Sequence, residues 1–308
     1  MRIITVTLNP AYDIHAKTIS FKEGEETLAD ITSYDIGGKG INISKALKAM
    51  DILTENIIVL GSENKEYYLN KMREEGLRFK EIYSRGRIRE NITIHDEKGV
   101  ETRLSFKGFK VDDNVLKELK EIIGTVDQST IICLSGSNPL GINKEELINY
   151  LIFLKDEGAK IIIDSKSFSL GELLSIKPLL IKPNEEELMT FCGLKKVNGE
   201  IIKKTGLELL DRGIENVLVS LGEKGAILCT KNGVYSGKVP KISVISTVGA
   251  GDSSVAGFIY SYIKNEDEKE LLINALSFGT AKCLNKGTCP PKKEDILSIK
   301  NKITVDVI

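Results

Sequence analysis

Residues 244–258 read Val-Ile-Ser-Thr-Val-Gly-Ala-Gly-Asp-Ser-Ser-Val-Ala-Gly-Phe, and the interpretation of the whole chain starts from them. The pattern predicts a short apolar strand, a glycine turn and then a helix. After the turn, apolar residues recur at helical spacing: Val255, Phe258, Ile259, Tyr262 and Ile263. Gly249 and Gly251 lack a Cβ atom, so the backbone can turn tightly there and a ligand can approach it closely.

The start of this helix is expected to bind an anion. Its first N–H groups have no partner within the helix, and they carry the positive end of the helix dipole. Asp252 is a carboxylate at the edge of that site. One interpretation is a general base that takes a proton from a hydroxyl attacking a phosphoryl group. The alternative is an aspartate that caps an ordinary helix.

Two familiar nucleotide-binding motifs are absent. The dinucleotide fingerprint needs a third glycine where this segment has Ser254, and Gly37-Gly38-Lys39-Gly40 does not satisfy the P-loop pattern. A bound nucleotide would therefore need another cradle. The failed fingerprint also weakens the alternative of a dinucleotide-dependent oxidoreductase.

Composition narrows the class of protein. The chain has 308 residues, of which 41% are apolar, enough for a sizeable core. A formal net charge of −1 argues against a general nucleic-acid binder, and no apolar run is long enough to predict a membrane span. The N-terminus begins as a strand rather than a signal peptide, and five scattered cysteines form no C-x-x-C pair. These features predict a cytoplasmic protein with reduced thiols.

Apolar strands without alternation are separated by helices along most of the chain. This pattern predicts a parallel sheet covered on both faces. The expected strands lie at 2–8, 57–61, 131–135, 161–165, 179–184 and 217–221, with antiparallel pieces at 226–229 and 234–237. No linker divides the chain, so residues 1–308 are expected to form one α/β domain.

Two weakly alternating regions, at about 14–36 and 82–108, predict a small sheet that stands off this domain as a lid. The second region carries a basic set: Arg85, Arg87, Arg89, Arg103 and Lys107. A solvated charged edge and a second anion contact both remain open for this set.

Three further groups are candidate binding residues. Asp13 follows the first strand, where it could meet a substrate hydroxyl or simply belong to a turn. Lys39, among three glycines at a helix start, could bring a cation to a phosphate or be a solvated turn residue. Asn184 and Glu187 could reach a metal–phosphate assembly, or could form a capping box.

The chain resembles the ribokinase-like, phosphofructokinase B type sugar kinases over nearly its whole length. The resemblance rests on five motifs in combination: Thr7-Leu8-Asn9-Pro10-Ala11-Tyr12-Asp13, Gly37-Gly38-Lys39-Gly40-Ile41-Asn42, Lys182-Pro183-Asn184-x-x-Glu187-Leu188, Val219-Ser220-Leu221-Gly222-x-x-Gly225 and Gly249-Ala250-Gly251-Asp252. The first two are similar to the branch of 1-phosphofructokinases and tagatose-6-phosphate kinases. The resemblance implies a Rossmann-like α/β/α sandwich with a β-sheet lid that often builds a homodimer.

The resemblance also implies roles for individual residues. Asp252 would be the base, with the amides of Gly249, Ala250, Gly251 and Asp252 as an anion hole. The substrate would be bound by Asp13, Gly37, Gly38, Lys39, Asn42, Arg89 and Asn91, with Lys39 and Arg89 on its phosphate. The nucleotide site would be lined by Lys182, Asn184, Ser220, Gly222, Glu223 and Gly225, with Asn285 and Gly287 flanking the adenine. Asn184 and Glu187 would organise Mg²⁺ through water.

The implied function is ATP-dependent phosphorylation of a ketohexose monophosphate, with fructose 1-phosphate as the first candidate and tagatose 6-phosphate as the alternative. A non-catalytic sugar-phosphate sensor is a further alternative, although a sensor would not need Asp252. Two departures bear on the sugar. The lid reads Ile88-Arg89-Glu90-Asn91 where the branch usually has Thr-Arg-x-Asn, and Ser105 stands where asparagine is common.

Overall fold

A ten-stranded sheet forms the centre of the fold, and a computed structural model describes it within residues 1–308. Its strand order is β14-β13-β12-β11-β10-β9-β8-β1-β4-β5. The run from β5 to β11 is parallel, and β12, β13 and β14 continue it in antiparallel pairing. The bounds are β1 Arg2–Thr7, β4 Glu55–Gly61, β5 Arg78–Ser84, β8 Thr130–Ser135, β9 Lys160–Asp164, β10 Leu180–Ile181, β11 Asn216–Ser220, β12 Ala226–Thr230, β13 Gly233–Lys238 and β14 Thr304–Val307.

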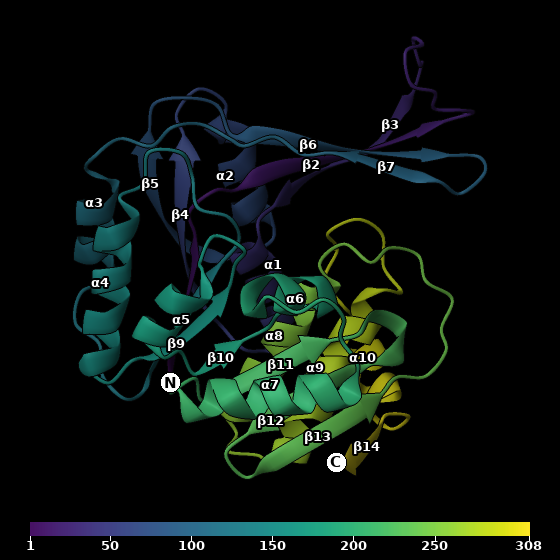
Figure 1. Ribbon diagram of the computed structural model, residues 1–308. Coiled ribbons are helices and arrows are strands. Elements are labelled where there is room, and N and C mark those ends of the chain that lie inside the picture. The colour runs from purple at the N-terminus through teal and green to yellow at the C-terminus, as the bar shows by residue number, and fades with distance from the viewer.

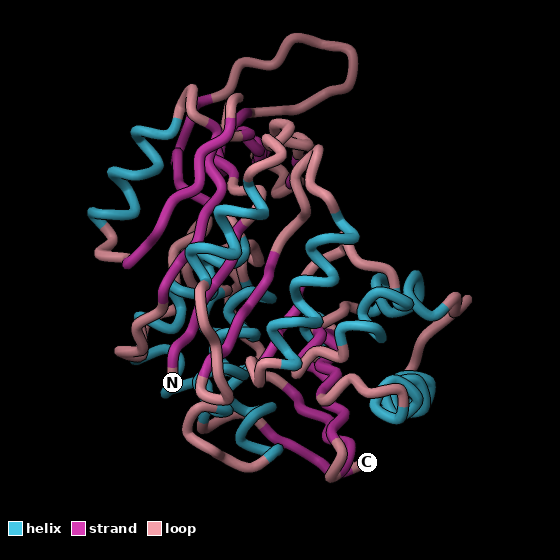
Figure 2. The backbone as a smooth tube through the Cα atoms, turned by 90° about the vertical axis from the view of Figure 1, so that its left-hand side faces the viewer, coloured by secondary structure: helices cyan, strands magenta, loops and turns pink.

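Helices cover both faces of this sheet (Figures 1 and 2). One face carries α3 (Val115–Ile123), α4 (Lys144–Asp156), α5 (Leu170–Ile176), α6 (Glu185–Cys192) and α7 (Gly199–Asp211). The other carries α1 (Lys39–Lys48), α2 (Lys65–Glu74), α8 (Ala250–Tyr262), α9 (Glu268–Lys282) and α10 (Lys293–Lys300). None of these helices is both long enough and apolar enough to cross a membrane.

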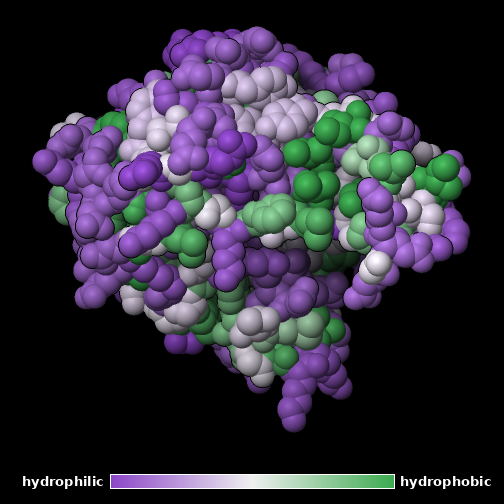
Figure 3. Space-filling view, turned by 90° about the horizontal axis from the view of Figure 1, so that it is seen from above, coloured by the Kyte–Doolittle hydropathy of each residue, from purple (hydrophilic) through white to green (hydrophobic).

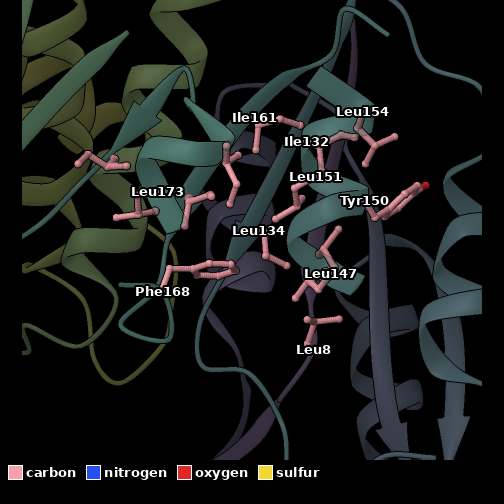
Figure 4. Packing of buried hydrophobic residues seen from close by; sticks show 14 of the residues in the cluster. Leu8, Ile132, Leu134, Leu147, Tyr150, Leu151, Leu154, Ile161, Phe168 and Leu173 are labelled. Carbon is pink, nitrogen blue, oxygen red and sulfur yellow. The ribbon is translucent and has the colours of Figure 1, made fainter. Parts of the chain in front are cut away.

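Burial on both faces explains why the central strands are apolar throughout. In β8, Ile132 and Leu134 join the core cluster on one face, whereas Ile131 and Cys133 join the cluster on the other. Successive side chains of a strand point to opposite faces, so a strand covered twice needs no polar positions. Figure 4 shows one such interface, where Leu147, Leu151 and Leu154 of α4 pack over β8 and β9.

A second sheet of four strands, in order β3-β2-β6-β7, forms the predicted lid. Its strands are β2 (Ala11–Thr18), β3 (Asp30–Gly37), β6 (Arg89–Asp96) and β7 (Glu101–Leu104). The sheet extends away from the helical layers (Figure 1). The predicted lid bounds need correction, because residues 82–84 belong to β5, which pairs in parallel with β4 in the central sheet. Ile82 is buried there, in the core.

One other expectation is wrong, and three elements were not expected. No strand forms at 244–248, where Val244 and Ile245 are each 56% exposed in a loop. That segment is attached by two backbone hydrogen bonds to the carbonyl of Cys283, so it lacks the ladder that a strand requires. Helices α5 and α7 and the edge strand β14 were not predicted.

Candidate active site

Asp252 lies in the first turn of α8 and is 6% exposed. The N-cap residue of this helix is Gly249, in the left-handed region with φ 80°, and no side chain caps the helix. The capping interpretation of Asp252 is therefore wrong. Its Oδ2 atom instead accepts a hydrogen bond from Nδ2 of Asn42 on α1 at 2.8 Å.

Asp164, at the end of β9, is the centre of a buried charge cluster beside Asp252. Its Oδ2 accepts a hydrogen bond from Nζ of Lys39 at 3.1 Å, and its Oδ1 lies 3.7 Å from Nζ of Lys182. Asp164 is 3% exposed. The sequence interpretation gave it no role, although its position at the carboxyl end of a buried parallel strand was a usable signal.

Burial and neighbouring charges shift the pKa values of this cluster in different directions. Burial raises the pKa of Asp252 above its ordinary 3.8; Lys39 opposes that shift and Asp164 adds to it. Burial would also raise the pKa of Asp164, but Lys182 and Lys39 hold it below the ordinary value. Burial lowers the pKa of Lys39, yet the carboxylates of Asp164 and Asp252 more than offset this and leave it raised. Asp252 is thus the stronger base of the two carboxylates.

Three of the four amides that were expected to form an anion hole are unpaired. The amides of Gly249, Gly251 and Asp252 have no hydrogen-bond partner in the chain, whereas the amide of Ala250 donates to Thr247 at 3.1 Å. A Cβ atom on Gly251 would lie 2.9 Å from Nζ of Lys182. The Lys182 ammonium therefore lies against the first turn of α8, and both features favour a bound anion.

Asp13 lies in the lid strand β2 rather than directly after the core strand, which corrects the predicted position. Its Oδ1 accepts hydrogen bonds from Nδ2 of Asn91 at 3.1 Å and from Nη2 of Arg103 at 3.4 Å. A Cβ atom on Gly37 would lie 2.0 Å from Oδ2 of Asp13, so only glycine allows this approach. Gly38, at the N-cap of α1, has φ 149°, which also favours glycine.

Arg89 links the lid to the loop after β1. Its Nη2 donates to the carbonyl of Asn9 at 3.0 Å, and its Nη1 donates to the carbonyl of Phe106 at 2.9 Å. Burial lowers the pKa of this guanidinium, although Asp13 partly opposes the shift. Arg89 has no carboxylate partner, so its positive charge is available to a nearby anion.

Asn184 and Glu187 form the capping box that the sequence offered as the structural alternative. The side chain of Asn184 accepts from the amide of Glu187 at 2.7 Å, and Oε2 of Glu187 accepts from the amide of Asn184 at 3.0 Å. No group of three or more His, Cys, Asp or Glu side chains is arranged to enclose a metal. Mg²⁺ is commonly held by one or two carboxylates with waters and substrate phosphates. Glu187 lines one pocket with Asp164 and Lys182, and its other partner, Lys166, is 70% exposed and easily displaced, so its carboxylate fits that mode.

The predicted nucleotide loops lie next to this capping box. Asn184 pairs with Ser220 in an isolated parallel bridge, and a short 3₁₀ turn at Gly222–Lys224 follows and includes Glu223. Space is open around Gly222, but a Cβ atom on Gly225 would lie 1.9 Å from the carbonyl oxygen of Gly237. Strand packing by itself thus accounts for the glycine at 225.

The loop with Asn285 and Gly287 contacts the lid. A Cβ atom on Gly287 would lie 3.3 Å from Oδ2 of Asp35 and 3.4 Å from Nε2 of His15. His15 and His95 lie side by side on the lid, with Nδ1 of His15 3.2 Å from Nε2 of His95. Neither histidine was expected to contact this loop.

Comparisons with known proteins show the family to which the chain belongs. A family model described as pfkB family carbohydrate kinase matches residues 6–295. The chain is 32% identical over 272 residues to the 1-phosphofructokinase of Escherichia coli strain K12, covering 88% of this chain and 87% of that protein. It is 31% identical over 281 residues to the 1-phosphofructokinase of Bacillus subtilis strain 168, covering 91% of each. The structure of phosphofructokinase-2 from Escherichia coli in complex with substrates and products is similar with a TM-score of 0.91, 25% identity, and coverage of 98% of this chain and 99% of that chain.

Replacing Asp164 with asparagine should strongly destabilise the fold. The substitution keeps the shape of the side chain but leaves Lys39 and Lys182 without a carboxylate. Breaking a buried ion pair in this way costs about 3–5 kcal/mol, so we expect a loss of that size in the free energy of unfolding measured with urea. Asp51→Asn is the matched control, because Asp51 pairs with Lys293 with its side chain 80% exposed. An equally small loss for both variants would contradict the prediction.

Proposed function

Because the chain belongs to the pfkB family of carbohydrate kinases, we propose that it transfers the γ-phosphoryl group of ATP to a ketohexose monophosphate, with fructose 1-phosphate as the substrate and fructose 1,6-bisphosphate as the product. Membership of this family makes the chain a phosphotransferase. The choice of sugar is supported by the relatives of 27–32% identity over most of the chain, whose names are 1-phosphofructokinase.

One observation carries the proposal: the buried carboxylate of Asp252 lies beside free amides at the start of α8 and close to the half-buried Lys39 and the buried Lys182. The helix end by itself favours a carboxylate, but a second anion bound at the same helix end would repel that carboxylate, so the two are expected together only where the chemistry uses both. Phosphoryl transfer to an alcohol needs both groups, since the hydroxyl must lose a proton while charge develops on the phosphoryl oxygens.

Asp252 acts as the general base in this mechanism. The sugar hydroxyl oxygen forms a bond to the γ-phosphorus as the bond between that phosphorus and the bridging oxygen of ADP breaks. The hydroxyl proton passes to Asp252. The hydrogen bond from Asn42 fixes Oδ2, which orients the carboxylate with Oδ1 free to accept this proton. The pKa raised by burial makes Asp252 a better proton acceptor.

The remaining residues bind and neutralise charge. The free amides of Gly249, Gly251 and Asp252, together with Lys182, hold the transferred phosphoryl group. On the lid, Asp13 and Asn91 bind sugar hydroxyls, and Arg89 holds the phosphate already on the sugar. Ser220 and the turn at 222–224 line the site of ATP next to Asn184. Mg²⁺, when bound through Glu187 and water, neutralises negative charge on the phosphates of ATP.

The lid also supports a proposal about assembly. A sheet that packs on a core normally turns its apolar face inward, but the lid has polar side chains on the face toward the domain and apolar side chains on its outer face. Asp13, His15 and Asn91 are buried, whereas Ile92 and Ile94 on the other face of β6 are only half-buried. Strand pairing places five apolar side chains on that outer face: Ile14, Ile31, Ile92, Ile94 and Leu104. The view from above shows hydrophobic side chains gathered in a band (Figure 3). A second copy of this sheet would cover the face, giving a two-fold homodimer through the lids.

Measurement of ADP release with a panel of sugars tests the activity. We expect fructose 1-phosphate to give the highest kcat/KM, with tagatose 6-phosphate, fructose 6-phosphate and unphosphorylated fructose below it. The Asp252→Asn variant should lose about 10²–10⁴-fold in kcat, as expected for the loss of a positioned base, with ATP binding unchanged. Near-normal turnover in this variant would exclude Asp252 as the base, and equal kcat/KM for fructose and fructose 1-phosphate would exclude a phosphorylated substrate.

The dependence of kcat on pH should report the raised pKa of Asp252. A base works only when it is deprotonated, so kcat should fall as the pH falls through this pKa, which burial places above 3.8. Steady-state kinetics between neutral and mildly acidic pH would measure this acid limb. The residual kcat of Asp252→Asn should not fall in this way at acidic pH. If it does, the fall in the wild-type protein comes from a group other than Asp252.

The dimer should be sensitive to charge on the outer face of the lid. Leu104 is 46% exposed on β7, so Leu104→Glu should weaken the dimer with little effect on the fold of each subunit. Leu297→Glu on α10 is the matched control, because Leu297 is 48% exposed and lies outside the lid. Light scattering at micromolar concentration would compare the two variants. A wild-type monomer, or equal behaviour of both variants, would refute assembly through the lid.

Sugar phosphate should also slow hydrogen exchange in β2, β3, β6 and β7. Asp13 lies in β2, and Arg89 and Asn91 lie in β6. A substrate bound by these residues would connect a sheet of low stability to the core and reduce its opening. Hydrogen-exchange mass spectrometry with and without fructose 1-phosphate would measure the effect. Unchanged exchange at saturating substrate would argue against closure of the lid.

A further inference from the structure

Lys282 is a buried cation to which neither the motifs nor the mechanism above assign a role. It is the last residue of α9 and is 1% exposed, yet it forms no ion pair. Its Nζ atom donates one hydrogen bond, to the carbonyl of Asn285 at 3.2 Å. A buried charge without a carboxylate partner is costly, so its presence at this position needs an explanation.

The side chain of Lys282 passes close to the glycine turn of the candidate site. A Cβ atom on Gly249 would lie 3.6 Å from Cε of Lys282, 3.7 Å from Nδ2 of Asn42 and 4.0 Å from Oδ2 of Asp252. These three groups therefore surround the same point at the start of α8. Lys282 belongs to α9 and Asn42 to α1, so two helices contribute to this point besides α8.

The residues around Lys282 connect the end of α9 to the segment that forms the anion site. The carbonyl of Cys283 accepts from the amides of Ile245 at 2.8 Å and Ser246 at 3.4 Å. One turn earlier, a Cβ atom on Gly279 would lie 2.2 Å from Oγ of Ser254 and 3.1 Å from the carbonyl oxygen of Ala250. The last turn of α9 thus supports residues 245–254 along their length, with the lysine at its centre.

We propose that Lys282 is an electrostatic positioning residue for phosphoryl transfer: its side chain packs against the glycine turn, and its ammonium group adds a fixed positive charge close to the anion site. The proposal rests on the proposed kinase function. In a dry interior, a positive charge close to the amides favours the charge that develops on the transferred group more than it favours the ground state. Lys282 therefore acts mainly on kcat, and not through direct contact with the sugar.

The surroundings of Lys282 also predict how its charge is lost. Burial lowers the pKa of this ammonium below the ordinary 10.5, while the nearby Cys283, Cys289 and Asp252 act in the opposite direction. A group with a lowered pKa loses its proton at a lower pH than an exposed lysine. The wild-type kcat should consequently fall at alkaline pH, below 10.5.

Two substitutions separate charge from hydrogen bonding. Lys282→Met keeps the length of the side chain and removes both the charge and the donor, whereas Lys282→Gln removes the charge and keeps an N–H donor for the carbonyl of Asn285. We expect kcat to fall at least about tenfold in both variants, with KM for ATP and sugar phosphate changed much less. Both variants should also lose the alkaline limb of the pH profile. Lys45→Met is the matched control, since Lys45 is a buried lysine on α1 that pairs with Glu75 away from this turn.

The outcomes are distinct. Normal kcat in Lys282→Met overturns the inference, and so does recovery in Lys282→Gln, because the hydrogen bond would then be sufficient. A fall in kcat in Lys45→Met equal to that in Lys282→Met would also overturn it, since loss of stability would explain both. If neither Lys282 variant folds, the wild-type profile decides, and no fall in kcat below pH 10.5 refutes the role of the charge. A wild-type protein without activity on any sugar phosphate would instead refute the proposed function.

Discussion

The pairing of Asp164 with Lys39 and Lys182 is the interaction on which the active site depends. The four charged groups of this cluster come from α1, β9, the residues after β10, and α8. Such a cluster is tolerated in a protein interior only when every charge has a partner in good geometry. The parallel order of β9 and β10 supplies that geometry, because it places the ends of adjacent strands at one edge of the sheet.

Close packing of α8 on α9 fixes the other half of the site. A Cβ atom on Gly257 would lie 2.2 Å from the carbonyl oxygen of Asn274, so the two helices approach each other at backbone distance. At the first turn of α8 the helices are again close, since a Cβ atom on Gly279 would lie 3.1 Å from the carbonyl oxygen of Ala250, and both Lys182 and Lys282 lie near this turn. The positive environment of the anion site is therefore a result of helix packing as well as of the glycine turn.

The sequence predicted the elements whose signal is local. The apolar runs of β8 and β9 and the glycine turn before α8 were recognisable because burial on both faces, or a left-handed φ at Gly249, restricts the residues allowed. For Asp164 the strand end gave only a general signal of a site, and for Lys282 there was no local signal at all. Asp164 acquires its role from Lys39, 125 residues away in the chain, and an aspartate at a strand end looks the same with or without that partner. The strand predicted at 244–248 was wrong for a related reason. Its amides bond to the carbonyl of Cys283, far away in the sequence, and not to a neighbouring strand.

The lid shows how one small sheet can serve both the site and the assembly. In a sheet packed on a core, the apolar face points inward, but here Asp13 and Asn91 point inward and Ile92 and Ile94 point outward. Polar side chains in a buried cleft are favourable only if they bond to each other or to a polar ligand, and Asp13 already bonds to Asn91 and Arg103. The outward apolar face would be stabilised if another protein surface buried it. A substrate bound beneath the sheet and a second subunit packed above it would each satisfy one face, so binding and assembly would stabilise the same four strands.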